Sequence, residues 1–462
     1  MMQIFKTLLA LALFASPQAF AAYSLPGYEK LTLENGLTLY LMEQDEVPLI
    51  DINLVVKAGA VNDGGKAGLT RITAENLVLG TQRLSKAELD EKLDFIGADI
   101  YSSANLEFSK LGASFASKDK NTVLPILRDI LLSPRFEQAE FDKYKKRHLL
   151  QIEQAKESPK SVIGNYFNRL VFGDKGYGSL SMGEEATVSA ITLADVKKHH
   201  STWYQPDNAA LIMVGDFDSQ KVKAELKQLF GQWQKTKALP KTSIPKATKH
   251  QKSNVLLVNK EDAGETTFLI GGQGITRSNP DIVGISVINT ILGGRFTSWL
   301  NDALRVNAGL TYGARSRFAS YSQDGSFSIS TFTRTETTIE AIDLALATYT
   351  KLWEKGIDKE TLASAKAYVK GQFPPKFETS EQLADLLVQM YGYGFDESYI
   401  NTFEQQVNSL TVEKTQKLIQ QYFPRDKLQF VLIGKADDIR EQVAKYGNIT
   451  ETNISNAMLT LN

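Results

Sequence analysis

Few side chains in this sequence of 462 residues have the types and spacing that catalysis needs. There is no cysteine, so disulfides, thiol catalysis, thiolate metal sites and a lipid-anchored cysteine are excluded. Adjacent His199 and His200 point to different faces of a helix, and His148 and His250 are isolated. We interpret all four as core or surface residues. The sequence also lacks a nucleophile elbow, a phosphate-binding glycine loop and a calcium loop, so no complete catalytic constellation is recognisable.

Arg305 and Tyr312 form a pair whose surroundings favour a binding site. The sequence predicts a helix over 296–307 that ends at Ala308-Gly309, with a strand from Leu310 onward. The chain reverses between the two residues, which lets the guanidinium and the phenol converge. Both groups donate hydrogen bonds and suit a peptide carbonyl that gains negative charge during attack. The alternative is a structural role, in which the arginine stabilises a helix end and the tyrosine packs in a strand. The spacing of the two residues alone favours this structural role.

Arg71 and Glu75 are a second pair, four residues apart on one face of a helix predicted for 68–79. They are either a buried ion pair or a solvated surface pair worth about 0.3–0.5 kcal/mol. The sequence leaves these two alternatives equally open.

The elements that must position these residues are a mixture of helices and strands. Asn35-Gly36 predicts a tight turn between two short strands, and Ser85 with Glu88 predicts a capping box at a helix start. Further predicted elements are strands over 50–56 and 106–115 and a long helix over 137–158. We therefore predict an α+β fold in which helices pack on largely antiparallel sheets.

Two segments of the chain repeat one pattern at a constant offset. Thr192 and Thr411 are each predicted to cap a helix, which is followed by a turn and a buried strand ending at Gly215 or Gly434. This indicates an internal duplication into two similar halves, which we expect to fold towards each other as a clam-like pair. Residues 234–253 between them are rich in lysine, contain two prolines and have no acidic residue, which is typical of a solvated linker.

Residues 1–21 predict a secretory signal peptide, with Lys6 in its basic region and Ala19-Phe20-Ala21 as a cleavage site. No other apolar run is long enough to cross a membrane. The predicted organisation is a signal peptide over 1–21, an N-terminal domain over 22–233, a linker over 234–253 and a C-terminal domain over 254–462. The formal net charge of −1 gives no electrostatic reason to expect nucleic acid as a partner.

In this order and spacing, several short motifs resemble the insulinase-like (pitrilysin-type) zinc peptidases, the inverzincins, and most of all their processing-peptidase branch. The resemblance covers nearly all of the predicted mature chain. It rests on these segments: 35–37, 68–70, 79–81, 177–178, 203–208, 214–216, 304–305 and 309–312.

The resemblance also shows what this sequence lacks. Active family members carry H-x-x-E-H on the helix after the Gly-Leu pair, and a glutamate on the next long helix completes the zinc site. The matching positions here are Arg71, Ala74, Glu75 and Gln151. Both ligand histidines and the general base are replaced, so the resemblance predicts a degenerate site that binds no metal.

In two-subunit members of the family, one subunit holds the zinc and the other supplies an arginine and a tyrosine that hold the substrate backbone. Arg305 and Tyr312 match that pair in spacing and in their flanking Leu-Arg and Gly-Leu. The resemblance therefore predicts a non-catalytic subunit of a periplasmic zinc peptidase of a Gram-negative bacterium. A homologous zinc-bearing partner would cut the peptide substrate, this chain would hold no cofactor of its own, and neither a membrane anchor nor nucleic acid is expected.

Two other hypotheses remain from the sequence. One is a proteolytically inactive peptide-binding or scaffold protein of the same fold, and the other is a hydrolase that uses a site foreign to the family. The sequence gives neither the substrate, the cleavage preference nor the partner's identity, and it leaves a homodimer open.

Overall fold

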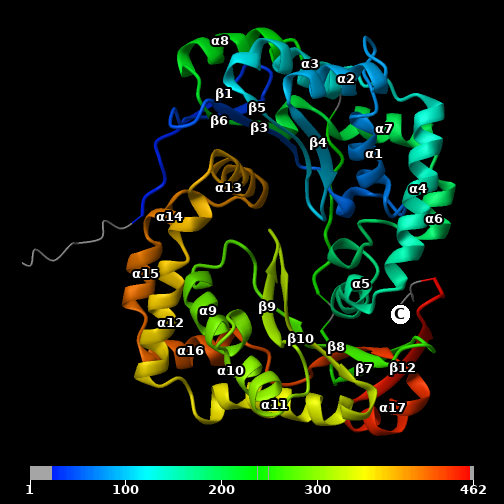
Figure 1. Ribbon diagram of the computed structural model, residues 1–462, viewed down its shortest axis with the longest axis vertical. Helices are drawn as coiled ribbons and strands as arrows, with labels where there is room; N and C mark the ends of the chain where they lie inside the picture. Colours follow the sequence, from blue (N-terminus) through cyan, green and yellow to red (C-terminus); the bar gives the residue numbers. More distant parts are fainter. Residues whose placement is uncertain (1–22, 237, 248, 458–462) are drawn as a thin grey trace, which may run out of the picture.

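The computed structural model describes residues 23–236, 238–247 and 249–457. It contains two six-stranded sheets, one in each half of the chain, and the halves lie opposite each other (Figure 1). The predicted signal peptide lies outside the described residues. Among the described residues, no helix combines the length and the apolar character needed to cross a membrane.

The first half builds its sheet in the order β1-β2-β6-β3-β5-β4 and surrounds it with helices. Its strands are β1 (Glu29–Thr32), β2 (Thr38–Glu43), β3 (Leu49–Val56), β4 (Asp99–Ala104), β5 (Ser109–Ala116) and β6 (Ala209–Gly215). Its helices are α1 (Leu69–Leu77), α2 (Lys86–Ile96), α3 (Lys120–Leu132), α4 (Gln138–Lys156), α5 (Pro159–Phe172), α6 (Glu185–Ala190), α7 (Leu193–Trp203) and α8 (Ser219–Phe230).

The second half repeats this plan in the order β12-β7-β11-β8-β10-β9. Its strands are β7 (Asn254–Asn259), β8 (Glu265–Gln273), β9 (Arg315–Ser320), β10 (Gly325–Arg334), β11 (Gln429–Gly434) and β12 (Asn448–Asn453). Its helices are α9 (Ile282–Asn289), α10 (Trp299–Asn301), α11 (Thr338–Glu354), α12 (Lys359–Gly371), α13 (Ser380–Tyr393), α14 (Ser398–Asn401), α15 (Phe403–Ser409), α16 (Val412–Tyr422) and α17 (Ala436–Val443).

The two sheets have the same central topology and differ at one edge. In both, one parallel pair (β2 with β6, β7 with β11) is followed by antiparallel neighbours. The outer strand beside this pair is β1 in the first sheet, antiparallel to β2, and β12 in the second, parallel to β7. The predicted α+β class, with two similar halves and largely antiparallel sheets, is therefore confirmed.

Local signals in the sequence account for several of these boundaries. Gly36 has a φ of 97° in the turn that joins β1 to β2, a conformation open to glycine. Ser85 and Glu88 form the predicted capping box at the start of α2. Thr192 and Thr411 both cap their helices as predicted, through hydrogen bonds from Asp195 N and Lys414 N.

Two predicted strands begin later than expected, because the backbone amides before them donate hydrogen bonds to acceptors outside the sheets. The side chain of Asn105 accepts hydrogen bonds from the amides of residues 107 and 108, so β5 begins at Ser109 and not at residue 106. After Gly309, the Leu310 amide bonds to the carbonyl of residue 304, and the amide of residue 314 bonds to Asn301. The next strand, β9, therefore begins at Arg315.

The helix predicted over 296–307 is also different in detail. It begins at Trp299, and its second part, Asp302–Asn307, is π-helical. Strand β4 was not predicted by the sequence, because its residues are mostly polar and only partly buried.

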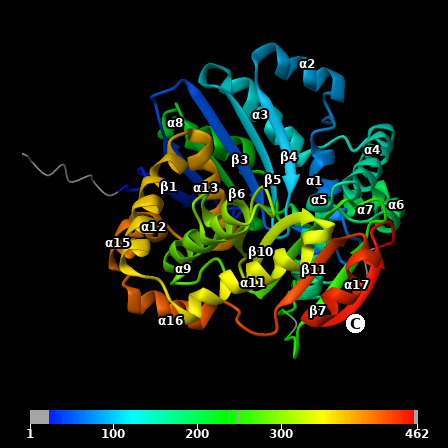
Figure 2. The same cartoon turned by 60° about the horizontal axis from the view of Figure 1, so that its bottom comes forward.

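The two halves exchange a helix with each other. Helix α13 of the second half packs on the first sheet along β3 and β6, and helix α5 of the first half packs on the second sheet along β8 and β11 (Figures 1 and 2). This explains why every residue of β6 is buried. Alternate side chains face the first half's own helices or the core shared with α13.

Residues 234–253 cross from one half to the other without helix or strand among their described positions. Their described lysines are exposed, whereas Ala247 is buried and its amide donates to Asp324 Oδ2 over 3.0 Å. His250 bonds to the carbonyl of Leu170 at the end of α5. The segment is thus anchored at its second end, and the predicted domain boundaries stay a prediction.

Candidate functional site

Arg71 and Glu75 form an ion pair on α1, with 2.8 Å between Arg71 Nε and Glu75 Oε1. Their side chains are 31% and 22% exposed, so the pair lies between the two alternatives that the sequence left open. The helix begins directly after Gly68, whose φ of 94° lets the chain enter α1 close to Met182 and Gly183. Ala74, between the pair in sequence, is fully buried.

Tyr144 and His148 on α4 complete this cluster from the neighbouring helix. The Tyr144 hydroxyl donates to Glu75 Oε2 over 2.7 Å, so both carboxylate oxygens have a partner. Burial, and then the Glu75 charge, raise the pKa of Tyr144 well above its ordinary value, which keeps it a neutral donor. The His148 ring stacks on Tyr144, and its Nε2 donates to the Met182 carbonyl over 2.7 Å.

His148 is buried, and burial lowers its pKa, so the ring is a neutral spacer in this cluster. Gln151 lies three residues further along α4 and is exposed. Tyr144 and His148 were not predicted as parts of the site. Tyr144, His148 and Gln151 are spaced by four and then three residues, which places all three on one face of α4. This spacing is the sequence signal from which Tyr144 and His148 could have been found.

A hydrogen-bonded chain anchors the start of α1. Buried Asp63 accepts from the amides of Gly68 and Thr70 and from the Thr70 hydroxyl. His199 Nε2 on α7 lies 3.0 Å from Thr70 Oγ1. Burial raises the pKa of Asp63 to about 7, while the bonds from residues 68 and 70 act in the opposite direction. This chain fixes where α1 enters the site, and with it the direction of Arg71.

The residues at the degenerate site do not fit a zinc ion. A zinc site needs three or four histidine, cysteine or carboxylate ligands, and of the matching positions only Glu75 carries one. Its two oxygens are already engaged, and the Arg71 guanidinium would repel a cation. Nowhere in the described residues do three or more His, Cys, Asp or Glu side chains come together as a possible metal site.

Arg305 and Tyr312 lie at the other candidate site, in the second half. Arg305 is in the π-helical segment, with its guanidinium carbon 4.5 Å from the centre of the exposed Phe296 ring. Tyr312 follows in the loop before β9 and is 81% exposed. Its ring stacks on Phe332 at 6.3 Å. It lines a cavity of about 370 Å³, whose wall also includes Lys160 from α5.

The structure records no hydrogen bond between Arg305 and Tyr312 among the residues it describes. Each side chain instead lies against an aromatic ring, and within the described part of the chain neither the guanidinium nor the phenol has a hydrogen bond or ion pair. The alternative in which Tyr312 packs inside a strand is wrong, because the residue precedes β9 and faces solvent.

Family comparisons agree with the site geometry. Residues 40–184 match the model described as the insulinase family, peptidase family M16. Residues 190–369 match the model described as the peptidase M16 inactive domain. With its zinc motif replaced, the chain belongs to peptidase family M16 as a non-catalytic member.

Individual relatives cover most of the chain at low identity. A zinc protease, PqqE, of Helicobacter pylori is 24% identical over 86% of this chain and 91% of its own length. A non-peptidase homolog, YmxG, of the same bacterium is 22% identical over 85% of this chain and 90% of its own length. The crystal structure of a peptidase M16 inactive domain from Pseudomonas fluorescens has the same fold, with a TM-score of 0.82 and 24% identity over 88% of this chain and 98% of that one.

Proposed function

We propose that this protein is the non-catalytic subunit of a periplasmic zinc peptidase and that it works with a homologous zinc-bearing partner. In this proposal the partner cuts the peptide, and Arg305 and Tyr312 help to hold the peptide backbone. The observation that carries the proposal is the contrast between the two halves. At the positions that match the zinc motif, Arg71 and Glu75 form an ion pair, whereas Tyr312 in the second half is exposed to solvent.

Three further observations support the Arg305 and Tyr312 assignment. An exposed tyrosine and a partly exposed arginine, neither with a side-chain hydrogen bond among the described residues, suit a carbonyl acceptor. Arg305 lies in a π-helical segment, a deviation that often marks functional positions. Phe296 and Val306 beside it are 61% and 62% exposed, so the neighbourhood is apolar as well as cationic.

The relatives support the pairing in a second way. Helicobacter pylori has both a zinc protease and a non-peptidase homolog that resemble this chain over most of its length. An organism with one protein of each kind has the two components that such a pair needs.

The decisive experiment is purification of the native protein from the periplasm, followed by mass spectrometry and a peptidase assay. We expect a homologous chain with an intact H-x-x-E-H motif to copurify, and we expect a chelator to abolish activity of the assembly. The chain alone should have no activity. A stable species without a zinc-bearing relative would contradict the proposal and favour a scaffold or peptide-binding protein.

A further inference from the structure

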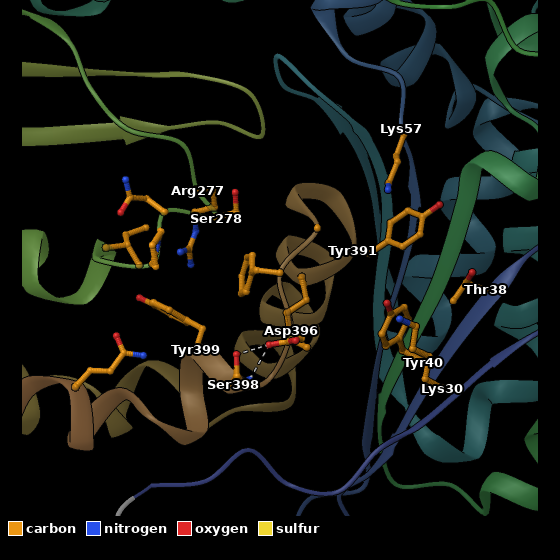
Figure 3. A pocket seen from close by; sticks show the side chains of 17 residues that line it. Lys30, Thr38, Tyr40, Lys57, Arg277, Ser278, Tyr391, Asp396, Ser398 and Tyr399 are labelled. Atoms are coloured by element: carbon orange, nitrogen blue, oxygen red, sulfur yellow. Dashed lines mark hydrogen bonds between the residues drawn. The ribbon is translucent and has the colours of Figure 1, made fainter. Parts of the chain in front are cut away.

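A second cavity, of about 610 Å³, lies where the two halves meet and involves neither α1 nor Arg305 (Figure 3). Its first wall comes from the first sheet, with Lys30 on β1, Tyr40 on β2 and Lys57 directly after β3. Its second wall comes from the second half. This wall includes the loop that contains Arg277, the end of α13, and α14. The volume is in the range of pockets that hold small ligands.

Three cations line this cavity, and none of them has an ion pair among the described residues. Each instead lies near an aromatic ring. Lys57 Nζ is 4.5 Å from the centre of Tyr391, and Lys30 Nζ is 5.2 Å from that of Tyr40. The Arg277 guanidinium carbon is 4.2 Å from the centre of Phe395 and 4.5 Å from that of Tyr399.

The cations also lack neutralising partners in the cavity. Asp396 is the one acidic residue in its lining, and it already accepts hydrogen bonds from the amide and the hydroxyl of Ser398. Arg277 Nη1 is buried without a hydrogen-bond partner in the described part of the chain. Burial, and then the charge of Lys30, lower the pKa of Lys57. The buried Arg277 nitrogen is therefore a donor that a ligand acceptor would satisfy, and the exposed ammonium groups of Lys30 and Lys57 add positive charge at the opposite wall.

We propose that this cavity binds an elongated anionic ligand with an apolar or aromatic middle part. Figure 3 shows Arg277 and Tyr399 on one side and Lys57, Tyr391 and Tyr40 on the other. A ligand with anionic groups towards Lys57 and Arg277 satisfies both cations, and its middle part contacts the rings between them. Carboxylates of a short acidic peptide and phosphates of a nucleotide share this chemistry. The proposal is independent of the proposed peptidase function.

The test is calorimetric titration of the full chain with three probes: the tripeptide Glu-Phe-Glu, its neutral amidated analogue Gln-Phe-Gln, and ADP. Binding of Glu-Phe-Glu identifies the ligand class as a carboxylate, and binding of ADP identifies it as a phosphate. We expect the neutral analogue to bind at least about tenfold more weakly than the acidic peptide. This comparison needs no variant. Absence of binding by both anionic probes, or equal binding of the acidic and neutral peptides without ADP binding, would overturn the proposal.

Variants then locate the binding in this cavity. Lys57→Met keeps an unbranched side chain on the Tyr391 ring, and Arg277→Gln removes the guanidinium. We expect each to raise the Kd of the bound probe at least about tenfold, and Arg277→Lys to have a smaller effect. Lys221→Met on α8, a 78% exposed residue, is the matched control and should leave the Kd unchanged. Unchanged Kd values in both Lys57→Met and Arg277→Gln would place the ligand elsewhere and refute the proposal.

Discussion

Arg71 shows how a single side chain changes the chemistry that one position of a fold can support. Its guanidinium binds Glu75, and Tyr144 occupies the second oxygen of the same carboxylate. Both oxygens of Glu75 are thus engaged by side chains of the protein. A positive charge is fixed on the helix that in active relatives of this family carries the zinc ligands.

The first prediction at this scale concerns metal content. After dialysis against metal-free buffer, the purified chain should hold well below one zinc per molecule by elemental analysis, because ligands are missing and Arg71 repels the ion. The matched comparison carries Arg71→His, Ala74→Glu, Glu75→His and Gln151→Glu, which restores the motif and should raise zinc content. About one zinc per unmodified chain would contradict this prediction.

A second prediction concerns Arg305 and Tyr312 in the proposed assembly with a zinc-bearing partner. Tyr312→Phe removes only a hydroxyl from an exposed ring, and Arg305→Lys keeps the charge but loses the planar fork. Each change should lower kcat/KM by about tenfold or more, because one donor to a developing oxyanion is worth about 10²–10³ in rate. Assembly and the partner's zinc should be unaffected.

Tyr368→Phe is the control for this experiment, because Tyr368 is a partly exposed tyrosine on α12. Its kinetics should equal those of the unmodified assembly. Unchanged kinetics in both Tyr312→Phe and Arg305→Lys would return these residues to a structural role. Melting temperatures measured alongside separate a loss of substrate binding from a loss of folding.

At the scale of elements, α1 depends on what holds its first turn. Asp63 supplies an acceptor to two amides and one hydroxyl, and Thr70 connects it to His199 on α7. The start of the helix is therefore fixed by a residue in the preceding loop and by a second helix.

Asp63→Ala should destabilise the protein by about 1–3 kcal/mol, because it leaves buried donors without an acceptor. Urea unfolding followed by circular dichroism measures this change. Ser85→Ala removes an exposed cap from α2 and should cost less. An equal or smaller effect of Asp63→Ala would show that another acceptor replaces the carboxylate.

Helix α7 makes stability depend on pH. Burial, and then His200, lower the pKa of His199 to about 4, and burial lowers that of His200 to about 4. In the unfolded chain both titrate near pH 6.5, so between these values the unfolded state binds more protons than the folded state. The contribution of this helix to stability should therefore be present above pH 6.5 and fall as the pH drops towards 4.

Urea titrations at several pH values between 4 and 8 measure this dependence. His199→Gln should flatten the slope of unfolding free energy against pH in that window, since it removes one of the two titrating groups. His250→Gln is the control, because His250 lies between the two halves, outside α7, where its ring bonds to the Leu170 carbonyl. An identical slope in His199→Gln and the unmodified chain would contradict the assignment.

At the scale of the whole molecule, the exchange of α5 and α13 packs the two halves against each other. The apolar face of α5 packs on β8 and β11, and that of α13 packs on β3 and β6. An ion pair of 2.8 Å between Lys110 and Asp385 adds a polar contact across the same joint. Each sheet therefore buries part of one face against a helix of the other half.

Separation of the halves should expose these faces. A fragment of residues 249–462 lacks α5, and we expect it to unfold without cooperativity or to aggregate when expressed alone. Coexpression with residues 23–248 should recover a soluble complex that unfolds cooperatively, as seen by calorimetry. Cooperative unfolding of the isolated fragment at the melting temperature of the intact protein would show that the exchange contributes little.

The sequence by itself determined what local chemistry and periodicity can encode. The hairpin turn at Asn35-Gly36, the capping box at Ser85, the paired caps at Thr192 and Thr411 and the replaced zinc motif were all predicted from short segments. Only the tertiary structure decided how distant segments combine. Tyr144 donates a hydrogen bond to Glu75, α5 and α13 each pack on the sheet of the other half, and Arg277 and Lys57 line opposite walls of one cavity. Such contacts depend on packing between residues far apart in the chain, so they leave no local pattern in the sequence.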